Sequence, residues 1–156
     1  MTRPRIRILV CGEPLRGDDG AAVLAAAGLS ADARALAEVF EVGQLSLVAM
    51  LDVPEGAAVI VADAAVGVAA GEVVVVPLAE IVEHSTAPTP ASSHSLPVDQ
   101  ILALAGEMRG SPFRGVFVGI GGAEFGFGEE LSPEVAAGLP ALTAALEAEI
   151  RRLSAG

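Results

Sequence analysis

The sequence contains no lysine, asparagine, tryptophan or tyrosine, and it has a single cysteine, Cys11. The absence of lysine excludes a P-loop, whose Gly-Lys-Ser/Thr segment needs that side chain to reach the phosphates. One cysteine cannot form an intrachain disulfide, so we expect the protein in a reducing compartment such as the cytoplasm. Because aromatic residues make up only 3% of the chain, the core must consist of Ala, Val, Leu and Ile.

Positive charge and long apolar runs are also scarce. Nine arginines face 20 acidic residues, which gives a net charge of −11. This charge repels nucleic acid and anionic membranes, so we expect neither as a partner. The apolar run after the basic start stops at Gly12, which is too short for a signal peptide, and no later run reaches transmembrane length. We therefore expect a cytoplasmic protein, and because nothing in the sequence requires an oligomer, a monomer.

The 156 residues, 53% of them hydrophobic, are enough for one domain, and we assign residues 1–156 to it. Short apolar, β-branched runs alternate with Ala/Leu-rich helical patterns. Continuous apolarity indicates strands buried on both faces, as in a parallel sheet covered by helices. We predict a doubly wound, mostly parallel five-stranded sheet in a three-layer α/β/α sandwich. The predicted strands are 6–11, 38–42, 57–62, 72–77 and 116–120, and the predicted helices are 19–27, 45–51, 96–108 and 133–153, the last broken or restarted at Pro140.

The segment after the first predicted strand, residues 12–20, is an acidic turn that we call the opening turn. Glycines after a buried strand normally indicate a phosphate site, but here the adjacent Asp18 and Asp19 would repel phosphate. A cation, and first of all a divalent metal, suits this turn better.

Two further candidate ligands follow from the predicted topology. Asp63 comes directly after the apolar run 57–62, and His94 lies in a Pro/Ser-rich loop before a predicted helix. Ligands of open α/β sheets bind beyond the carboxyl ends of the strands, so Asp19, Asp63 and His94 are expected to converge there. Two carboxylates and an imidazole suit zinc, nickel, manganese or iron and leave coordination positions open. Each residue also has a simpler interpretation: Asp19 as a helix cap, Asp63 as a turn residue, and His94 as a hydrogen-bonded loop histidine.

Other chemistries fit the sequence less well. Gly-x-Gly-x-x-Gly, Gly-x-Ser-x-Gly and His-Glu-x-x-His are all absent, which disfavours a dinucleotide site, a serine hydrolase and a helical zinc protease. An aspartic dyad of Asp19 and Asp63 that shares one proton is conceivable, but it leaves His94 without a role. A metal site uses all three residues.

Four short motifs, in order along nearly the whole chain, carry a family resemblance. They are Pro-Leu-Arg-Gly-Asp-Asp-Gly at 14–20, Ile-Val-Ala-Asp-Ala at 60–64, Ser-Ser-His at 92–94, and Val-Gly-Ile at 118–120 followed by Leu-Ser-Pro-Glu-Val at 131–135. With these motifs the sequence resembles the hydrogenase maturation endopeptidases, which finish the large subunit of nickel–iron hydrogenases.

The resemblance implies that Asp19, Asp63 and His94 are both the metal ligands and the catalytic residues. It implies an endopeptidase that engages the large-subunit precursor once that precursor holds nickel and removes its C-terminal tail. The nickel is then part of the substrate, although the isolated protein can take other divalent metals. Glu13 stands where the family usually has asparagine, and we keep Glu13 and Asp18 as additional candidate ligands. The alternatives are a non-cleaving, metal-binding assembly factor of the same fold and a small-molecule metallohydrolase.

Overall fold

A computed structural model describes residues 6–84, 97–128 and 130–156. Strands and helices are interspersed along these residues, with two or more helices or two strands in succession at three places. In chain order they are β1 (Ile6–Cys11), the 3-10 helix η1 (Gly17–Gly20), α1 (Ala21–Ala27), α2 (Ala31–Leu36), β2 (Glu38–Gly43), α3 (Leu47–Leu51), β3 (Ala58–Ala70), β4 (Val73–Pro77), α4 (Leu78–Glu83), α5 (Val98–Arg109), β5 (Gly115–Gly121) and α6 (Pro133–Ala155).

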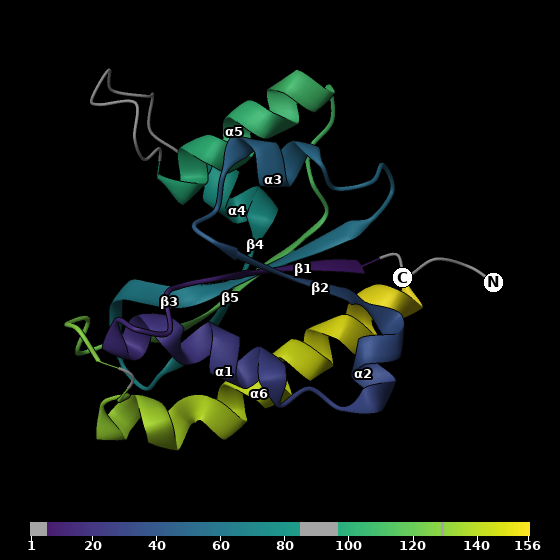
Figure 1. The fold of residues 1–156 in the computed structure, drawn as a ribbon. Coiled ribbons are helices and arrows are strands. Elements are labelled where there is room, and N and C mark those ends of the chain that lie inside the picture. The colour runs from purple at the N-terminus through teal and green to yellow at the C-terminus, as the bar shows by residue number, and fades with distance from the viewer. Residues whose placement is uncertain (1–5, 85–96, 129) are drawn as a thin grey trace.

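The strands form one five-stranded sheet in the order β2-β1-β3-β5-β4. Strands β2, β1, β3 and β5 run parallel to one another, and β4 pairs antiparallel with β5 at one edge. Helices α3, α4 and α5 cover one face of the sheet, and α1, α2 and α6 cover the other (Figure 1). The predicted three-layer α/β/α sandwich with a mostly parallel five-stranded sheet is confirmed.

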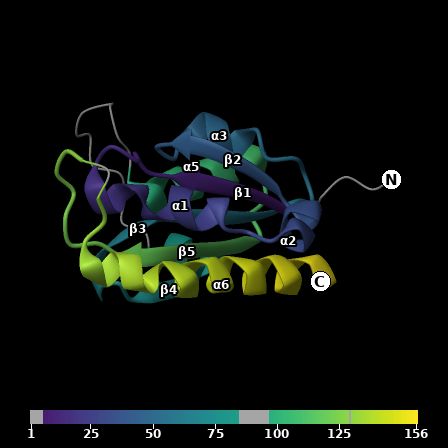
Figure 2. The ribbon, with the colours of Figure 1, turned by 60° about the horizontal axis from the view of Figure 1, so that its bottom comes forward.

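The two faces of the sheet have separate cores because side chains alternate along each strand. Ile8 and Val10 of β1 pack under α1 and α6, whereas Leu9 and Cys11 pack under α3 and α5. Figure 2 shows α6 lying along the sheet on the first of these faces. All four side chains are almost fully buried, which explains why the strand is apolar at every one of these positions.

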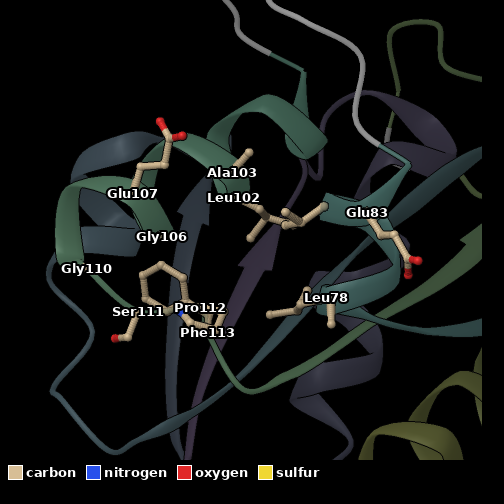
Figure 3. A pocket seen from close by; sticks show the side chains of 12 residues that line it. Leu78, Glu83, Leu102, Ala103, Gly106, Glu107, Gly110, Ser111, Pro112 and Phe113 are labelled. Atoms are coloured by element: carbon tan, nitrogen blue, oxygen red, sulfur yellow. The ribbon is translucent and has the colours of Figure 1, made fainter.

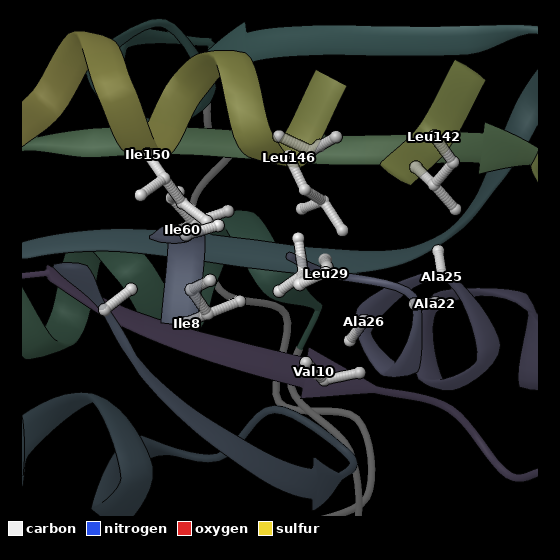
Figure 4. Packing of buried hydrophobic residues seen from close by; sticks show 14 of the residues in the cluster. Ile8, Val10, Ala22, Ala25, Ala26, Leu29, Ile60, Leu142, Leu146 and Ile150 are labelled. Carbon is white, nitrogen blue, oxygen red and sulfur yellow. The ribbon is translucent and has the colours of Figure 1, made fainter. Parts of the chain in front are cut away.

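Helix α6 is continuous from Pro133 to Ala155, so the predicted break at Pro140 is wrong. A proline inside a helix removes one backbone hydrogen bond and costs about 3 kcal/mol. The packing of the helix outweighs this cost: Leu142, Leu146 and Ile150 are fully buried on one face and point at β1, β3 and α1 (Figure 4).

Three other differences from the prediction concern short or weakly patterned segments. Helices α2 and α4, of six residues each, were not predicted. Strand β3 runs on to Ala70 instead of ending at residue 62; beyond residue 62 it pairs with the end of β5 at residues 63–65 and, after a shift in register, at Ala70. Helix α5 is described from Val98 onward, and residue 96 of the predicted helix lies outside the described residues.

The parallel strands all end at the same edge of the sheet, which we call the carboxyl edge. The opening turn follows β1 there, and the β2–α3 and β5–α6 connections begin there (Figures 1 and 2). Across the described ranges, no helix is long and apolar enough to span a membrane.

We expect Leu146→Ala to lower the free energy of unfolding by about 2–5 kcal/mol, because it leaves a cavity between α6 and the sheet. Leu24→Ala is the matched control, since Leu24 on α1 is 47% exposed and its loss should be much smaller. Urea unfolding of both variants measures the difference. Equal losses would contradict the assignment of the buried face of α6.

Candidate functional site

The opening turn is shaped by two glycines that no other residue can replace without strain. Gly12 has a φ of +120°, and a Cβ there would overlap the carbonyl oxygen of Asp19. Gly17 has a φ of +59°, and a Cβ there would lie 2.6 Å from the carbonyl oxygen of Glu124. The first half of the turn can therefore fold back on η1, which forms its second half, and the turn can pack against the β5–α6 connection. This places Asp19 at the carboxyl edge.

Asp63 lies inside β3 rather than after it. Strand β1 pairs with β3 only as far as Ala62, whereas Asp63 still pairs with Gly119 of β5. Asp63 is thus the first residue of β3 beyond its pairing with β1, level with Cys11 at the end of that strand. Its side chain belongs to the face covered by α5, as the alternation along β3 requires.

Asp19 and Asp63 line the same pocket, which has a volume of about 560 Å³. The Oδ2 atom of Asp19 accepts a hydrogen bond of 2.8 Å from the backbone N–H of Glu13, and Oδ1 of Asp63 accepts one of 2.8 Å from the N–H of Ala64. Within the described ranges, the second oxygen of each carboxylate has no hydrogen-bond partner. The pocket is lined by Gly12, Glu13, Arg16, Asp19, Gly43, Gln44, Leu45, Asp63, Pro97, Val98 and Ile101.

The pocket disfavours the charged form of Asp63. Burial, helped by the nearby negative charge of Asp19 and opposed by the hydrogen bond from Ala64, raises the pKa of this carboxyl from 3.8 to about 6. A bound cation would relieve both effects. Two carboxylates, one of them hard to ionise alone, are a donor set that fits a divalent metal.

Cys11 lies beside these carboxylates but does not join their chemistry. Burial, followed by the charge of Asp63, raises the pKa of its thiol from 9.0 to about 12. The thiol is therefore protonated at neutral pH and is a poor nucleophile.

Asp18 does not line the pocket, although it is adjacent to Asp19. It is fully buried and accepts four hydrogen bonds: from the backbone N–H groups of Ala123, Glu124 and Ser132, and from the hydroxyl of Ser132, at 2.7–2.9 Å. Burial would raise its pKa, but these donors outweigh burial and lower the pKa below 3.8. Both carboxylate oxygens are engaged, so the geometry gives Asp18 a structural role instead of the additional ligand role kept open from the sequence.

Of the two remaining candidate ligands, the structure describes Glu13 but not His94. Glu13 lines the pocket, and its Oε1 accepts a 3.2 Å hydrogen bond from the N–H of Leu15 in the same turn. His94 lies outside the described residues. Among the residues that are described, no three His, Cys, Asp or Glu side chains are grouped closely enough to hold a metal ion, and the three-residue site stays a prediction.

A second pocket, of about 550 Å³, lies between α4, α5 and the segment before β5 (Figure 3). Its walls are mainly apolar, with Leu78 and Leu102 pointing into it and Glu83 and Glu107 at its rim. It contains no pair of candidate ligands comparable to Asp19 and Asp63. The pocket lined by Asp19 and Asp63, which we call the acidic pocket, is therefore the candidate site.

Comparison with known proteins decides the family. The family model described as hydrogenase maturation protease matches residues 28–149, more than half of the sequence. The chain belongs to the hydrogenase maturation protease family. It is therefore a hydrolase of the endopeptidase type. A search of curated proteins found no match.

Solved structures of maturation proteases share the fold. HybD from Thermococcus kodakarensis is 28% identical, with 92% of this chain and 97% of that chain covered and a TM-score of 0.69. HybD from E. coli is 20% identical, with 95% and 93% covered and a TM-score of 0.74. HycI from T. kodakarensis is 22% identical, with 95% and 93% covered and a TM-score of 0.66.

The family match includes the positions of Asp63 and His94, but it begins after the opening turn that carries Asp19. The geometry adds two polar residues of this maturation protease that sequence reasoning did not place in the site. Arg16 brings a positive charge to the pocket, and Gln44 reaches it from the end of β2. Gln44 could have been predicted, because it follows β2, which is parallel to β1 and ends at the same edge of the sheet.

We expect Asp18→Asn to lower the free energy of unfolding by about 2–4 kcal/mol, because an amide cannot accept all four hydrogen bonds and leaves buried N–H groups unpaired. Urea unfolding at pH 7 measures the loss. Asp32→Asn removes the same charge from an exposed position in the first turn of α2 and should lose no more than about 1 kcal/mol. A neutral result for Asp18→Asn would contradict its structural role.

We expect Asp63→Asn to stabilise the metal-free protein at pH 7.5. As pH rises, the carboxyl of Asp63 loses its proton near pH 3.8 in the unfolded chain but only near pH 6 in the native state. The free energy of unfolding of the wild type therefore falls between these pH values by up to roughly 3 kcal/mol. The asparagine variant lacks this loss. Chelator-treated samples unfolded in urea at several pH values should show a gain at pH 7.5 that disappears below pH ~4.

The exposed Asp32→Asn variant serves again as the charge control in this titration. A gain for Asp63→Asn that does not depend on pH, or a loss at pH 7.5, would contradict the raised pKa of Asp63.

Proposed function

We propose that this maturation protease removes the C-terminal tail from the large-subunit precursor of a nickel–iron hydrogenase after the precursor has received nickel. In this proposal the enzyme acts as a monomer in the cytoplasm, and the nickel arrives as part of the substrate. The observation that carries the proposal is the convergence of Asp19 and Asp63, 44 positions apart in the sequence, on one pocket at the carboxyl edge.

The donors in the pocket support recognition of a metal that another protein brings. Each of the two carboxylates has one oxygen engaged by a backbone N–H, which fixes its orientation. The other oxygen of each is without a partner among the described residues. With His94 as a third donor, the set would be mixed oxygen and nitrogen, which suits nickel and also zinc, manganese or iron. Three protein donors leave positions for ligands that the precursor supplies.

Two routes to hydrolysis are open to these residues. A bound metal would polarise the scissile carbonyl and activate water. Alternatively, Asp63 would act as general base, and a carboxylate with a pKa of about 6 is close to the value that a base needs near neutral pH. In both routes Asp19 and Asp63 hold the reacting groups at the carboxyl edge, and Arg16 adds a positive charge in the same pocket.

We expect Asp19→Asn and His94→Ala each to lower the rate of tail removal at least ~100-fold, because each removes one predicted ligand from the catalytic group. The assay incubates the protein with nickel-loaded precursor and follows the intact mass of the precursor. Asp32→Asn should trim at the wild-type rate.

Circular dichroism spectra of the variants confirm that they are folded. Equal trimming by the two ligand variants and the wild type would refute the proposed roles. Binding of the precursor without any tail removal by the wild type would favour a non-cleaving assembly factor, for which the additional carboxylate of Glu13 is the distinguishing feature.

A further inference from the structure

The β5–α6 connection presents aromatic side chains to solvent beside the acidic pocket. Phe127 is 94% exposed and Phe125 is 43% exposed, and Leu15 of the opening turn is 51% exposed. We call these three residues the aromatic patch. In a chain with only five phenylalanines, two exposed in one connection are unusual, because an exposed phenylalanine gains nothing from folding.

The backbone that carries the patch is held firmly. Gly128 donates a 2.8 Å hydrogen bond to the carbonyl of Leu15 and accepts one of 2.8 Å from Gly17. At the other end of the connection, the N–H of Asp18 donates to the carbonyl of Glu124 at 2.7 Å, and the Asp18 carboxylate accepts two hydrogen bonds in return. The exposure of Phe127 is thus a property of a backbone tied to the opening turn.

The internal packing of the connection accounts for Phe125 but not for Phe127. A Cβ on Gly122 would lie 2.4 Å from the ring of Phe125, so this ring lies directly over the Gly122 backbone. Phe125 therefore also holds the shape of the connection. Phe127, between Gly126 and Gly128, is almost entirely in solvent, and packing among the described residues gives its ring no role.

The patch adjoins the acidic pocket. Leu15 stands in the opening turn between Glu13 and Arg16, which both line the pocket together with Asp19. The β5–α6 connection lies against this turn at the carboxyl edge in both views of the fold (Figures 1 and 2). A protein that places a metal between Asp19 and Asp63 would meet the patch next to the pocket.

We propose that the aromatic patch is the docking surface for the large-subunit precursor, with Phe127 as its anchor; this inference rests on the proposed function. The matching surface on the precursor is an apolar hollow beside its C-terminal tail, with basic residues around it. Three acidic residues are exposed near the patch: Glu13, Glu124 and Glu130. Because the chain also carries a net charge of −11, basic residues around the apolar hollow of the precursor would complement this surface. Aromatic residues that fill a partner's pocket commonly carry much of the binding energy.

The experiment compares Phe127→Ala with Met108→Ala. Met108 is 59% exposed on α5, toward the opposite edge of the sheet, so it matches Phe127 as an exposed apolar residue far from the pocket. Binding of nickel-loaded precursor is measured by titration, and KM and kcat are measured by the mass assay. We expect Phe127→Ala to raise both Kd and KM at least ~10-fold with kcat near the wild-type value. Met108→Ala should change none of them.

A conservative variant separates docking from local structure. Phe127→Leu keeps an apolar anchor and should restore Kd to within about threefold of the wild type. All three variants should unfold at the wild-type urea concentration, because neither side chain is part of the core.

The outcomes are distinct for the two proposals. If the wild type trims the precursor and Phe127→Ala binds it equally well, the docking surface is refuted while the proposed function stands. If the wild type binds the precursor without trimming it, the proposed function fails, and a weaker Kd for Phe127→Ala still supports docking. A wild type that does not bind the precursor refutes docking as well. Loss of a wild-type dimer in Phe127→Ala, measured by sedimentation, would assign the patch to self-association instead.

Discussion

The buried carboxylate of Asp18 is the interaction on which the active region depends. It joins the opening turn to the β5–α6 connection and to Ser132, the N-cap residue of α6, through four hydrogen bonds. A buried charge is stable only when it is fully paired, and here backbone N–H groups supply the pairing. The same N–H groups would otherwise lack partners. One side chain therefore fixes the turn that carries Asp19 and the connection that carries Phe127.

The acidic pocket that Asp19 and Asp63 line lowers the stability of the protein. Asp63 occupies a position on a central strand where an apolar residue would pack better, and Asp19 lies close enough to raise its pKa. Most neighbours of Asp63 on this face, such as Leu9 and Val61, are buried hydrophobic residues. Placing a carboxylate there has no benefit for the fold. Groups with pKa values perturbed in this way cluster at functional sites, which supports the proposed role of Asp63 in holding an ion or a proton.

Much of the fold was predictable because most of its strands are continuous apolar, β-branched runs in the sequence. Strands β1 and β4 were predicted to within one residue of their observed ends. The second half of β3 could not be found, since its Ala-Gly-rich sequence has no strand pattern and its pairing with β5, at Ala64, Ala65 and Ala70, depends on a segment distant in the sequence. The six-residue helices α2 and α4 are too short for a recognisable helical period.

The part of the candidate site that could be predicted is the part that depends only on the topology of the sheet. Parallel strands end at one edge, so the meeting of Asp19 and Asp63 follows from recognising β1 and β3. The role of Asp18 was not accessible, because its partners are 105 to 114 residues away and are mostly backbone groups, which carry no sequence signal. The role of His94 stays a prediction, because this residue lies outside the described ranges.

The position of the pocket has a consequence for how the enzyme can diversify. Strand β1 lies between β2 and β3, and the chain reaches β2 through α1 and α2 on one face but returns to β3 through α3 on the other. The crevice between these departing connections exists in any sequence with this winding order, whatever side chains line it. Substitutions in the loops around the crevice can therefore change which protein it binds, while the buried residues of the sheet and helices beneath it stay the same.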